Sequence, residues 1–364
     1  MGAYARHIKR PLSNPKNIMS NLTFQHQFNL DALREYLAQH PPLIALAPSD
    51  SSAQTRHFLH HTLNLPEQSF FTIKANTPLP SAINQLKIHP QAAQAPLLAA
   101  ISANGKTHLL SGKQSLITPS DSLAILADHH RAIPPLHSLT GVARSLPTSR
   151  AIDIVAAQHQ FTCYQTPTGW QYFLPLLSTN LIQLCGEENF SLSGYPLEEK
   201  NSLWALLCWF SLLAQKRQNA DQILQNHWQR YGKHHHKRFD FINLPKSHAQ
   251  TMLTTFERNS HANIGNRLNG LTLTAAQQFN YTDPTNQQQS QDQGLQLIFG
   301  RQARIICRLT SRPTHADTTD LRLYCEYWQQ HLDTPPALTA PTATLATLAQ
   351  GMMNLEHHQP NSVS

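Results

Sequence analysis

Segments with the helical spacing of apolar residues alternate with short apolar segments typical of strands from residue 30 to residue 232. NLDALREYLAQH and SRAIDIVAAQHQ have the helical pattern, whereas PLIALAP, APLLAAIS and LIQLCGE are short and apolar. Strands that alternate with helices form mostly parallel sheets whose two faces are covered by the helices. The alternation therefore predicts an α/β architecture for this part of the chain.

The pattern changes after Gly232. Four strand-like segments follow one another, with helical segments before and after them: LTLTAAQQFNYT, GLQLIFG, RIICRLT and DLRLYCEYW. Consecutive strands of this kind indicate an antiparallel α+β domain. We therefore expect a loose N-terminal segment at 1–24, α/β domains with mixed sheets at 25–115 and 116–232, and an α+β domain at 233–364.

Charge and hydropathy argue against several classes of protein. The formal net charge is +7, but the 28 Lys and Arg residues are scattered along the chain, so we expect no nucleic-acid partner. We interpret the one dense basic run, KHHHKR at 233–238, as a solvated linker. The longest apolar run, 203–214, is too short to cross about 30 Å of hydrocarbon, and the five cysteines form no CxxC motif. The N-terminus lacks the apolar core of a signal peptide, so we expect a soluble cytoplasmic protein without a membrane partner.

Two predicted strands of the second domain end in segments with polar side chains. Ligands of an open α/β sheet bind beyond the carboxyl ends of its strands. Thr168 offers a hydroxyl and Glu187 a carboxylate, while Gly169 lets the backbone approach a ligand. Such a set suits the hydroxyl groups of a sugar. In the alternative interpretation, Glu187 and Glu188 only cap the following helix, and Trp170 packs in the core.

Longer strings resemble a known family. GVARSLPTSRAIDIVA, YQTPTGWQYF, LCGEENF and EEKNSLWALLCWFSLLAQK follow the order of the third domain of phosphoglucomutases, which are α-D-phosphohexomutases. NHWQRYGKHHHKRFDF, FNYTDP, QGLQLIFGRQARIICRL and LRLYCEYW resemble the C-terminal fourth domain, which is TATA-binding-protein-like. The segment LDALREYLAQHPPLIALAPSDSSAQTRHFLHHTL resembles the second domain more weakly. The resemblance spans roughly residues 25–355 and implies domains 2 to 4 of this family.

The resemblance implies the interconversion of glucose 1-phosphate and glucose 6-phosphate, an intramolecular phosphotransfer of carbohydrate metabolism. In the family, a phosphoserine loop of the first domain transfers the phosphoryl group, and Mg²⁺ held by three aspartates of the second domain neutralises it. This sequence has no such serine loop and begins about where the second domain should begin, so we expect the first domain to be absent. The metal loop reads ISANGKT, with Ile101, Ala103 and Gly105 at the aspartate positions. We expect no catalytic residue and no cofactor.

The resemblance also assigns binding residues. The positions that match the sugar-binding loops are Thr168, Gly169, Glu187 and Asn189, where Asn189 replaces a serine. The positions that match phosphate contacts are Lys200, Arg308, Thr310 and Arg322. Three departures weaken phosphate binding: Glu198 replaces an arginine, Pro196 replaces a histidine, and Pro313 removes an N–H from the phosphate loop.

We interpret the chain as a catalytically incompetent phosphoglucomutase-like protein that keeps partial binding of a glucose phosphate, or a role in binding a protein partner. One alternative is an active mutase whose phosphoserine domain comes from another chain, and a second is a decaying gene product without a function. Without a first domain, we expect an apolar face around residues 30–115. That face would be repolarised, covered by the N-terminal segment, or buried by a protein partner.

Overall fold

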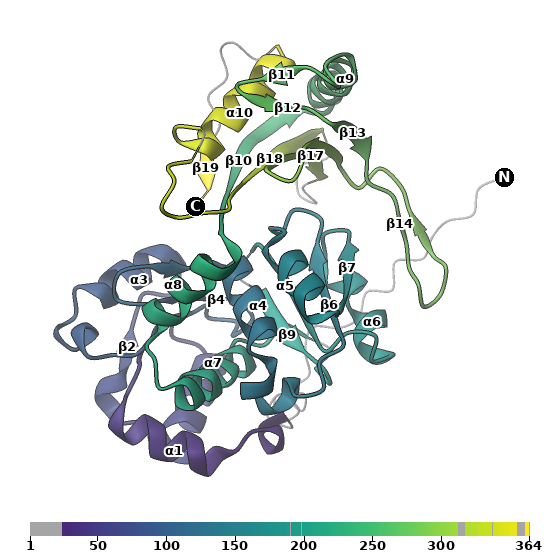
Figure 1. Cartoon of the computed structure of the whole chain (residues 1–364). Coiled ribbons are helices and arrows are strands. Elements are labelled where there is room, and N and C mark those ends of the chain that lie inside the picture. The colour runs from purple at the N-terminus through teal and green to yellow at the C-terminus, as the bar shows by residue number, and fades with distance from the viewer. Residues whose placement is uncertain are drawn as a thin grey trace.

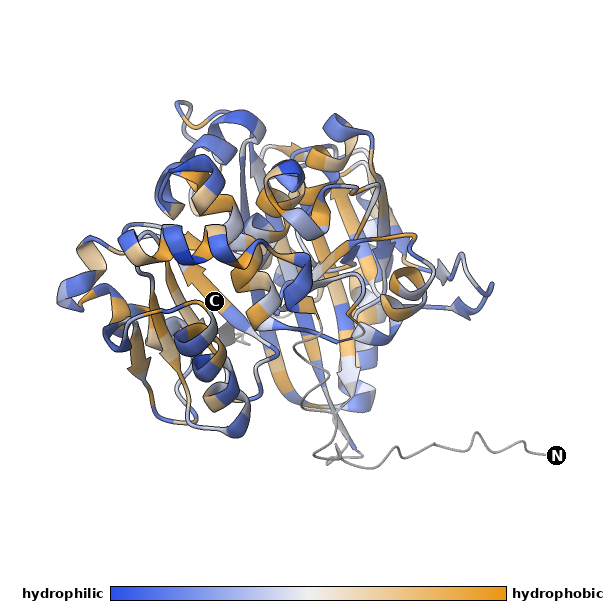
Figure 2. Ribbon diagram, turned by 90° about the horizontal axis from the view of Figure 1, so that it is seen from below, coloured by the Kyte–Doolittle hydropathy of each residue, from blue (hydrophilic) through white to orange (hydrophobic). Residues whose placement is uncertain are grey.

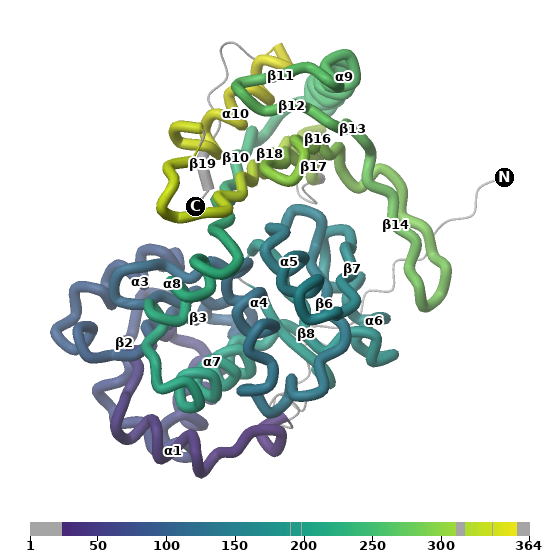
Figure 3. The backbone as a smooth tube through the Cα atoms, viewed as in Figure 1, coloured from purple at the N-terminus to yellow at the C-terminus, as the bar shows by residue number. Residues whose placement is uncertain are grey.

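A computed structural model describes residues 24–189, 191–197, 199–311, 317–336, 338–354 and 361–363. The segment up to α8 (Ala220–Tyr231) forms a wide lower layer, and the C-terminal part forms a separate unit above it (Figure 1). The backbone passes from one to the other through Gly232, directly from α8 into β10 (Lys233–Pro245) (Figure 3).

The first sheet has five strands in the order β2-β1-β3-β4-β5. They are β1 (Leu43–Leu46), β2 (Phe70–Thr72), β3 (Leu98–Ile101), β4 (His108–Ser111) and β5 (Leu116–Ile117). β1 is parallel to β2 and β3, whereas β4 and β5 are antiparallel. Alternate residues of β1 face two cores on opposite sides of the sheet. One core lies under α3 (Leu79–Lys87). The other lies under α1 (Leu30–Gln39) and under the π-helical turn Phe58–Thr62, which follows α2 (Asp50–His57). Helices therefore cover both faces of the parallel strands.

The second sheet has four strands in the order β7-β6-β8-β9. They are β6 (Gly141–Ser145), β7 (Thr162–Thr166), β8 (Leu184–Glu187) and β9 (Ser191–Gly194). β6 is parallel to β7 and β8, and β9 is antiparallel to β8. One face packs on α4 (Pro119–Asp128) and α5 (Ala151–His159), and the other packs on α6 (Leu174–Ser178). The carboxyl ends of β6, β7 and β8 consequently share one edge.

Helix α7 (Ser202–Lys216) joins the two sheets. Its sequence is apolar on nearly every side, which is typical of a helix buried all round. It packs against α1 of the first sheet and against α4 and β9 of the second, and Trp204 and Trp209 are fully buried. Trp209 Nε1 donates to Ser122 Oγ of α4 at 2.8 Å. One continuous core therefore runs through both sheets.

The third sheet has six antiparallel strands in the order β13-β16-β17-β18-β10-β19. Besides β10 they are β13 (Ala275–Gln278), β16 (Leu295–Phe299), β17 (Ala303–Ser311), β18 (Thr318–Gln329) and β19 (Asn361–Val363). α9 (Lys246–Ala262) and α10 (Pro341–Met352) cover one face over a separate core. Two short hairpins project from this unit, β11 (Arg267–Leu268) with β12 (Leu271–Thr272), and β14 (Tyr281–Thr282) with β15 (Gln289–Ser290). The second hairpin reaches down toward α6 (Figure 1), where Ser290 Oγ lies 3.2 Å from Tyr172 Oη.

A buried charged cluster joins the third sheet to the segment that follows β6. Glu326 of β18 is 1% exposed and lies 2.7 Å from Arg304 Nη2 and 2.8 Å from His234 Nδ1. The same carboxylate accepts a hydrogen bond from Arg150 N–H at 2.7 Å, and Arg304 donates to the carbonyls of Leu146 and Thr148. Burial alone would raise the pKa of Glu326, but Arg304, His234 and Arg150 lower that pKa well below its ordinary value.

The predicted fold class is confirmed, because two mixed α/β sheets precede an antiparallel α+β unit. The prediction of a linker at 233–238 is wrong: this run is the first half of β10, paired with β18 and partly with β19. Its histidines are accommodated because partners face them, Glu326 for His234 and the carbonyl of Pro147 for His236 at 2.7 Å. The N-terminal segment expected at 1–24 lies outside the described residues, except for the buried Phe24.

The surface of the first sheet's unit shows few protruding apolar side chains. Among the described residues 24–117, the large hydrophobic side chains most open to solvent are Ile88, at 84% exposure, and Leu116, at 38%. Hydrophilic residues are interspersed with hydrophobic ones along the outer helices (Figure 2). In the described part of the chain, no helix combines the length and hydropathy needed to cross a membrane.

We predict acid sensitivity from His108 of β4. Burial lowers its pKa from 6.5 to about 4, so the folded state holds the imidazole neutral while the unfolded state binds a proton below pH 6.5. Stability is therefore complete above pH 6.5 and is lost as the pH falls toward 4, by about 2 kcal/mol at pH 5. Urea unfolding at pH 5 and 7.5 should show a smaller pH-dependent loss for His108→Leu than for the wild type. The exposed His261→Leu is the matched control, and an equal loss in the wild type and His108→Leu would contradict the prediction.

Candidate functional site

The carboxyl ends of β7 and β8 bring the predicted sugar-binding residues together. Glu187, the last residue of β8, is 1% exposed, and its Oε1 accepts a hydrogen bond from Gly169 N–H at 2.9 Å. Its Oε2 lies 2.6 Å from Lys200 Nζ. A carboxylate held by one backbone N–H and one ammonium is fixed in orientation, and its remaining lone pairs can accept hydrogen bonds from the hydroxyl groups of a ligand.

Gly169 makes this arrangement possible. Its φ is +127°, a backbone conformation that residues with a Cβ rarely adopt, and a Cβ would lie only 2.6 Å from the Gln171 side-chain amide. On either side of Glu187, Thr168 Oγ1 and Asn189 Oδ1 are buried without a hydrogen-bond partner among the described residues. Asn189 Nδ2 lies 3.4 Å from Glu187 Oε2. Leaving such polar atoms unpaired costs about 1–3 kcal/mol each, which a hydroxyl-bearing ligand would relieve.

Lys200, predicted as a phosphate contact, lies on the sugar side of the site. Its ammonium binds Glu187 and stands 5.5 Å from the centroid of the Trp170 ring, a cation–π distance. Trp170 also packs partly against the core below it. The alternative in which the glutamates cap a helix is wrong, because β9 lies between them and α7, and Asn201 caps α7 by accepting from Trp204 N–H at 2.9 Å.

Glu188, to which the sequence assigned no binding role, contacts the end of β6 and the segment after it. Its Oε2 accepts from Ser145 Oγ at 3.2 Å, at the end of β6, and its N–H donates to Thr148 Oγ1 at 3.1 Å. Burial raises the pKa of Glu188, the neighbouring Glu187 raises it further, and Arg308 lowers it. The sequence signal for Glu188 was its place in the pair Glu187–Glu188 at the end of a predicted strand. Glu188 thus connects the sugar side of the site to the third sheet.

Arg308 and Arg322 stand opposite each other on β17 and β18. The Nε atoms of both arginines and Thr310 Oγ1 are buried without a hydrogen-bond partner among the described residues. The Asp240 carboxylate forms an ion pair with Arg322, but its Oδ2 is 3.9 Å from Arg322 Nε, beyond hydrogen-bond distance. Two guanidinium groups with free donors suit bidentate binding of a phosphate. The departures predicted at Glu198 and Pro313 lie outside the described residues.

Tyr324 is a further residue of this site, two positions along β18 from Arg322. Its hydroxyl is buried without a hydrogen-bond partner among the described residues. Burial and the charge of Glu188 raise the pKa of Tyr324 to about 12, although Arg308 and Arg322 lower it. The phenol therefore keeps its proton near neutral pH and can donate to an anion. Alternation along LRLYCEYW, which places every second side chain on one face, was the sequence signal for it.

The segment that would hold Mg²⁺ does not fit a metal ion. The Ile101 side chain is in the core. The Ala103 carbonyl accepts a hydrogen bond from Ser49 Oγ at 2.5 Å, and the Gly105 carbonyl accepts one from the first N–H of α7 at 3.0 Å. Lys106 adds an ammonium, paired with Glu199 at 2.8 Å. Mg²⁺ requires several hard oxygen ligands. Across the described residues, no group of three or more His, Cys, Asp or Glu side chains is placed to hold a metal ion.

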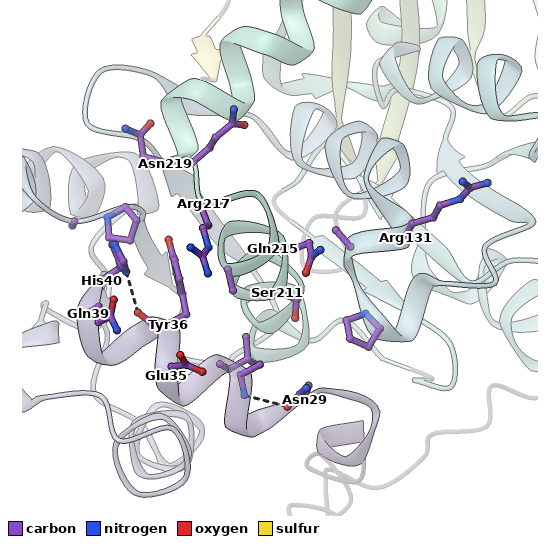
Figure 4. A pocket seen from close by; sticks show the side chains of 18 of the residues that line it. Asn29, Glu35, Tyr36, Gln39, His40, Arg131, Ser211, Gln215, Arg217 and Asn219 are labelled. Atoms are coloured by element: carbon purple, nitrogen blue, oxygen red, sulfur yellow. Dashed lines mark hydrogen bonds between the residues drawn. The ribbon is translucent and has the colours of Figure 1, made fainter.

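Another hollow lies away from these residues. A groove of about 1090 Å³ runs between α1 and the C-terminal end of α7 and is lined largely by polar side chains (Figure 4). Tyr36 and His40 stack there at 4.7 Å between ring centroids, and Arg217 lies on the opposite wall. None of the predicted sugar or phosphate residues lines this groove, so we place the candidate site at the strand ends.

Comparison with known proteins gives the same assignment. The family profile "Phosphoglucomutase/phosphomannomutase, alpha/beta/alpha domain III" matches residues 118–231, and the profile "Phosphoglucomutase-1, C-terminal domain" matches residues 233–361. Together they account for well over half of the chain. The chain belongs to the phosphoglucomutase family.

Curated relatives in this family are longer than the chain. It is 33% identical over 270 residues to a phosphoglucomutase of Rhizobium radiobacter, which covers 72% of this chain and 49% of the relative. It is also 33% identical to phosphoglucomutase-like protein 5 of Mus musculus, over 68% of this chain and 46% of the relative. The chain thus spans about half the length of these phosphoglucomutase relatives.

A solved structure shows the same fold. Parafusin, a phosphoglucomutase from Paramecium in an open form, superposes with a TM-score of 0.81 at 24% identity. The superposition covers 94% of this chain and 63% of parafusin. The N-terminal α/β unit, to which neither family profile extends, is therefore part of the same phosphoglucomutase architecture.

We predict that Glu187→Gln lowers the pKa of Glu188. The substitution removes the negative charge that raises this pKa and frees the Lys200 ammonium nearby. A carboxyl ¹³C NMR titration of the two proteins measures the shift directly. Glu257→Gln, on α9, is the matched control and should leave the Glu188 titration in place. An unchanged or raised Glu188 pKa in Glu187→Gln would show that the two carboxylates do not interact.

Proposed function

We propose that this protein binds a glucose phosphate between the second and third sheets without transferring its phosphoryl group. The observation that carries the proposal is that the Nε donors of Arg308 and Arg322 are buried without hydrogen-bond partners among the described residues. Arg308 is close enough to Glu188 to lower its pKa, and Glu188 follows the oriented Glu187 carboxylate in the chain. The arginines and the carboxylate each suit one end of a glucose phosphate. Arginines bind the phosphate, and a fixed carboxylate accepts from sugar hydroxyls.

The residues of the loop at 101–106 do not supply what phosphoryl transfer requires. Phosphoryl transfer requires a positioned nucleophile and a cation that neutralises charge on the moving group. The loop at 101–106 offers no carboxylate, and its Lys106 is engaged by Glu199. Recognition without turnover is therefore the function that these residues support best.

We predict that glucose 1-phosphate binds equally in EDTA and in Mg²⁺. Arg308→Gln should weaken binding at least tenfold, because a hydrogen bond to a charged group contributes about 1.5–3 kcal/mol. Isothermal titration calorimetry measures both effects, and Arg258→Gln on α9 is the matched control. Binding that requires Mg²⁺, or that survives Arg308→Gln unchanged, would contradict the proposal.

We also predict no mutase activity. The purified chain with glucose 1-phosphate, glucose 1,6-bisphosphate and Mg²⁺ should form glucose 6-phosphate no faster than buffer does. Glucose 6-phosphate is measured by coupled oxidation. Turnover above background, abolished by Arg308→Gln, would show that the chain performs the transfer itself.

A further inference from the structure

The junction of the third sheet with the segment after β6 has two sides. Arg322, Tyr324, Glu326 and Trp328 alternate along β18 and therefore lie in a row on one face. The segment after β6 contacts the middle of this row, because Leu146 packs on Tyr324, and Ser149 Oγ donates to Glu326. The arginines of the candidate site thus lie at one end of the row, and Trp328 lies at the other.

A rear groove of about 780 Å³ opens at the Trp328 end. It runs between α5, α8, the turn that joins β16 to β17, and the segment after β18. Five cationic or protonatable side chains line it from these elements and from β10: Arg150, Arg230, Arg301, His331 and His234. Arg150 and Arg301 are in contact, since Arg150 Nη2 donates to the Arg301 carbonyl at 3.2 Å. The third and second sheets therefore contribute jointly to this groove.

The acidic groups near the rear groove are already engaged by cationic side chains, and one arginine of the groove is itself paired: Arg230 Nη1 lies 3.6 Å from Asp128 Oδ1. Asp153 lines it, but Arg144 holds both of its carboxylate oxygens at 2.6 Å. Glu326 is bound by Arg304 and His234. Within the described part of the chain, the Arg301 guanidinium has no ion pair. The groove consequently has an excess of positive charge.

Two buried polar atoms beside the groove lack hydrogen-bond partners among the described residues. His234 lines the groove, its side chain is only 4% exposed, and its Nε2 has no hydrogen-bond partner among the described residues. Arg150 Nε is likewise buried without a hydrogen-bond partner among the described residues, although it forms an ion pair with Glu326 Oε2 at 3.6 Å. Buried polar groups are normally satisfied. Nitrogens without hydrogen-bond partners beneath a rim of arginines indicate a place where oxygen atoms of a ligand belong.

We propose that the rear groove is a second anion site that binds a phosphate-bearing small molecule. Guanidinium groups from separate elements can share the oxygens of one phosphate or diphosphate. The indole of Trp328 and the ring of Tyr231 also line the groove, so an organic group can pack beside the phosphate. The site is distinct from the glucose phosphate site, because Arg308 and Arg322 do not line it.

Isothermal titration calorimetry of the whole chain with pyrophosphate tests the proposal. Arg301→Gln and Arg230→Gln should each weaken pyrophosphate binding at least fivefold, and the double variant should weaken it more. Arg258→Gln should bind as the wild type does. The same titration with ADP separates the two sources of the ligand: tighter binding than pyrophosphate identifies an organic phosphate, and equal binding identifies the inorganic ion.

Arg308→Gln separates this site from the glucose phosphate site. It should remove glucose 1-phosphate binding and leave at least one pyrophosphate site intact. The proposal is overturned if neither probe binds, if Arg301→Gln and Arg230→Gln bind pyrophosphate as the wild type does, or if Arg308→Gln alone abolishes its binding. The last outcome would leave the glucose phosphate proposal standing.

Discussion

The buried carboxylate of Glu326 holds the third sheet in place over the strand ends of the second. It binds Arg304 and His234 from its own sheet and the N–H of Arg150 from the other unit. A buried ion cluster contributes little net stability, because removing the charges from water offsets much of their attraction. We interpret its contribution as positional, because Glu326 lies on the same strand as Arg322 and binds the segment that follows β6.

The candidate site and the loop at 101–106 differ in how many of their polar groups have hydrogen-bond or ion-pair partners. At the site, arginine, threonine and tyrosine donors are buried without partners in the described residues. In the 101–106 loop, by contrast, backbone carbonyls and Lys106 are engaged by neighbouring groups. Unpaired polar groups persist where a ligand supplies the missing partner. The contrast supports the proposed recognition of a phosphorylated sugar without phosphoryl transfer.

Much of the fold could be predicted from the sequence because its signals are local. Local apolar patterns predicted the helices α1 and α5 and the strands β16 and β17. The interpretation of KHHHKR as a linker was wrong because pairing with a distant strand decides its structure. Glu326, 92 residues after His234, supplies the carboxylate that stabilises this histidine inside β10. The strand β9 was missed for the same reason, since SLSG has no pattern of its own and pairs with β8.

The site was only partly predictable. Thr168, Gly169, Glu187 and Asn189 meet as their places at strand ends suggest, but the orientation of Lys200 toward Glu187 depends on the path of the chain before α7. A crystal structure of the protein grown with glucose 1-phosphate and Mg²⁺ tests the account most directly. We expect the phosphate between Arg308 and Arg322, sugar hydroxyls on Glu187, and no magnesium in the 101–106 loop. Magnesium bound in that loop, or a sugar phosphate bound away from these arginines, would contradict it.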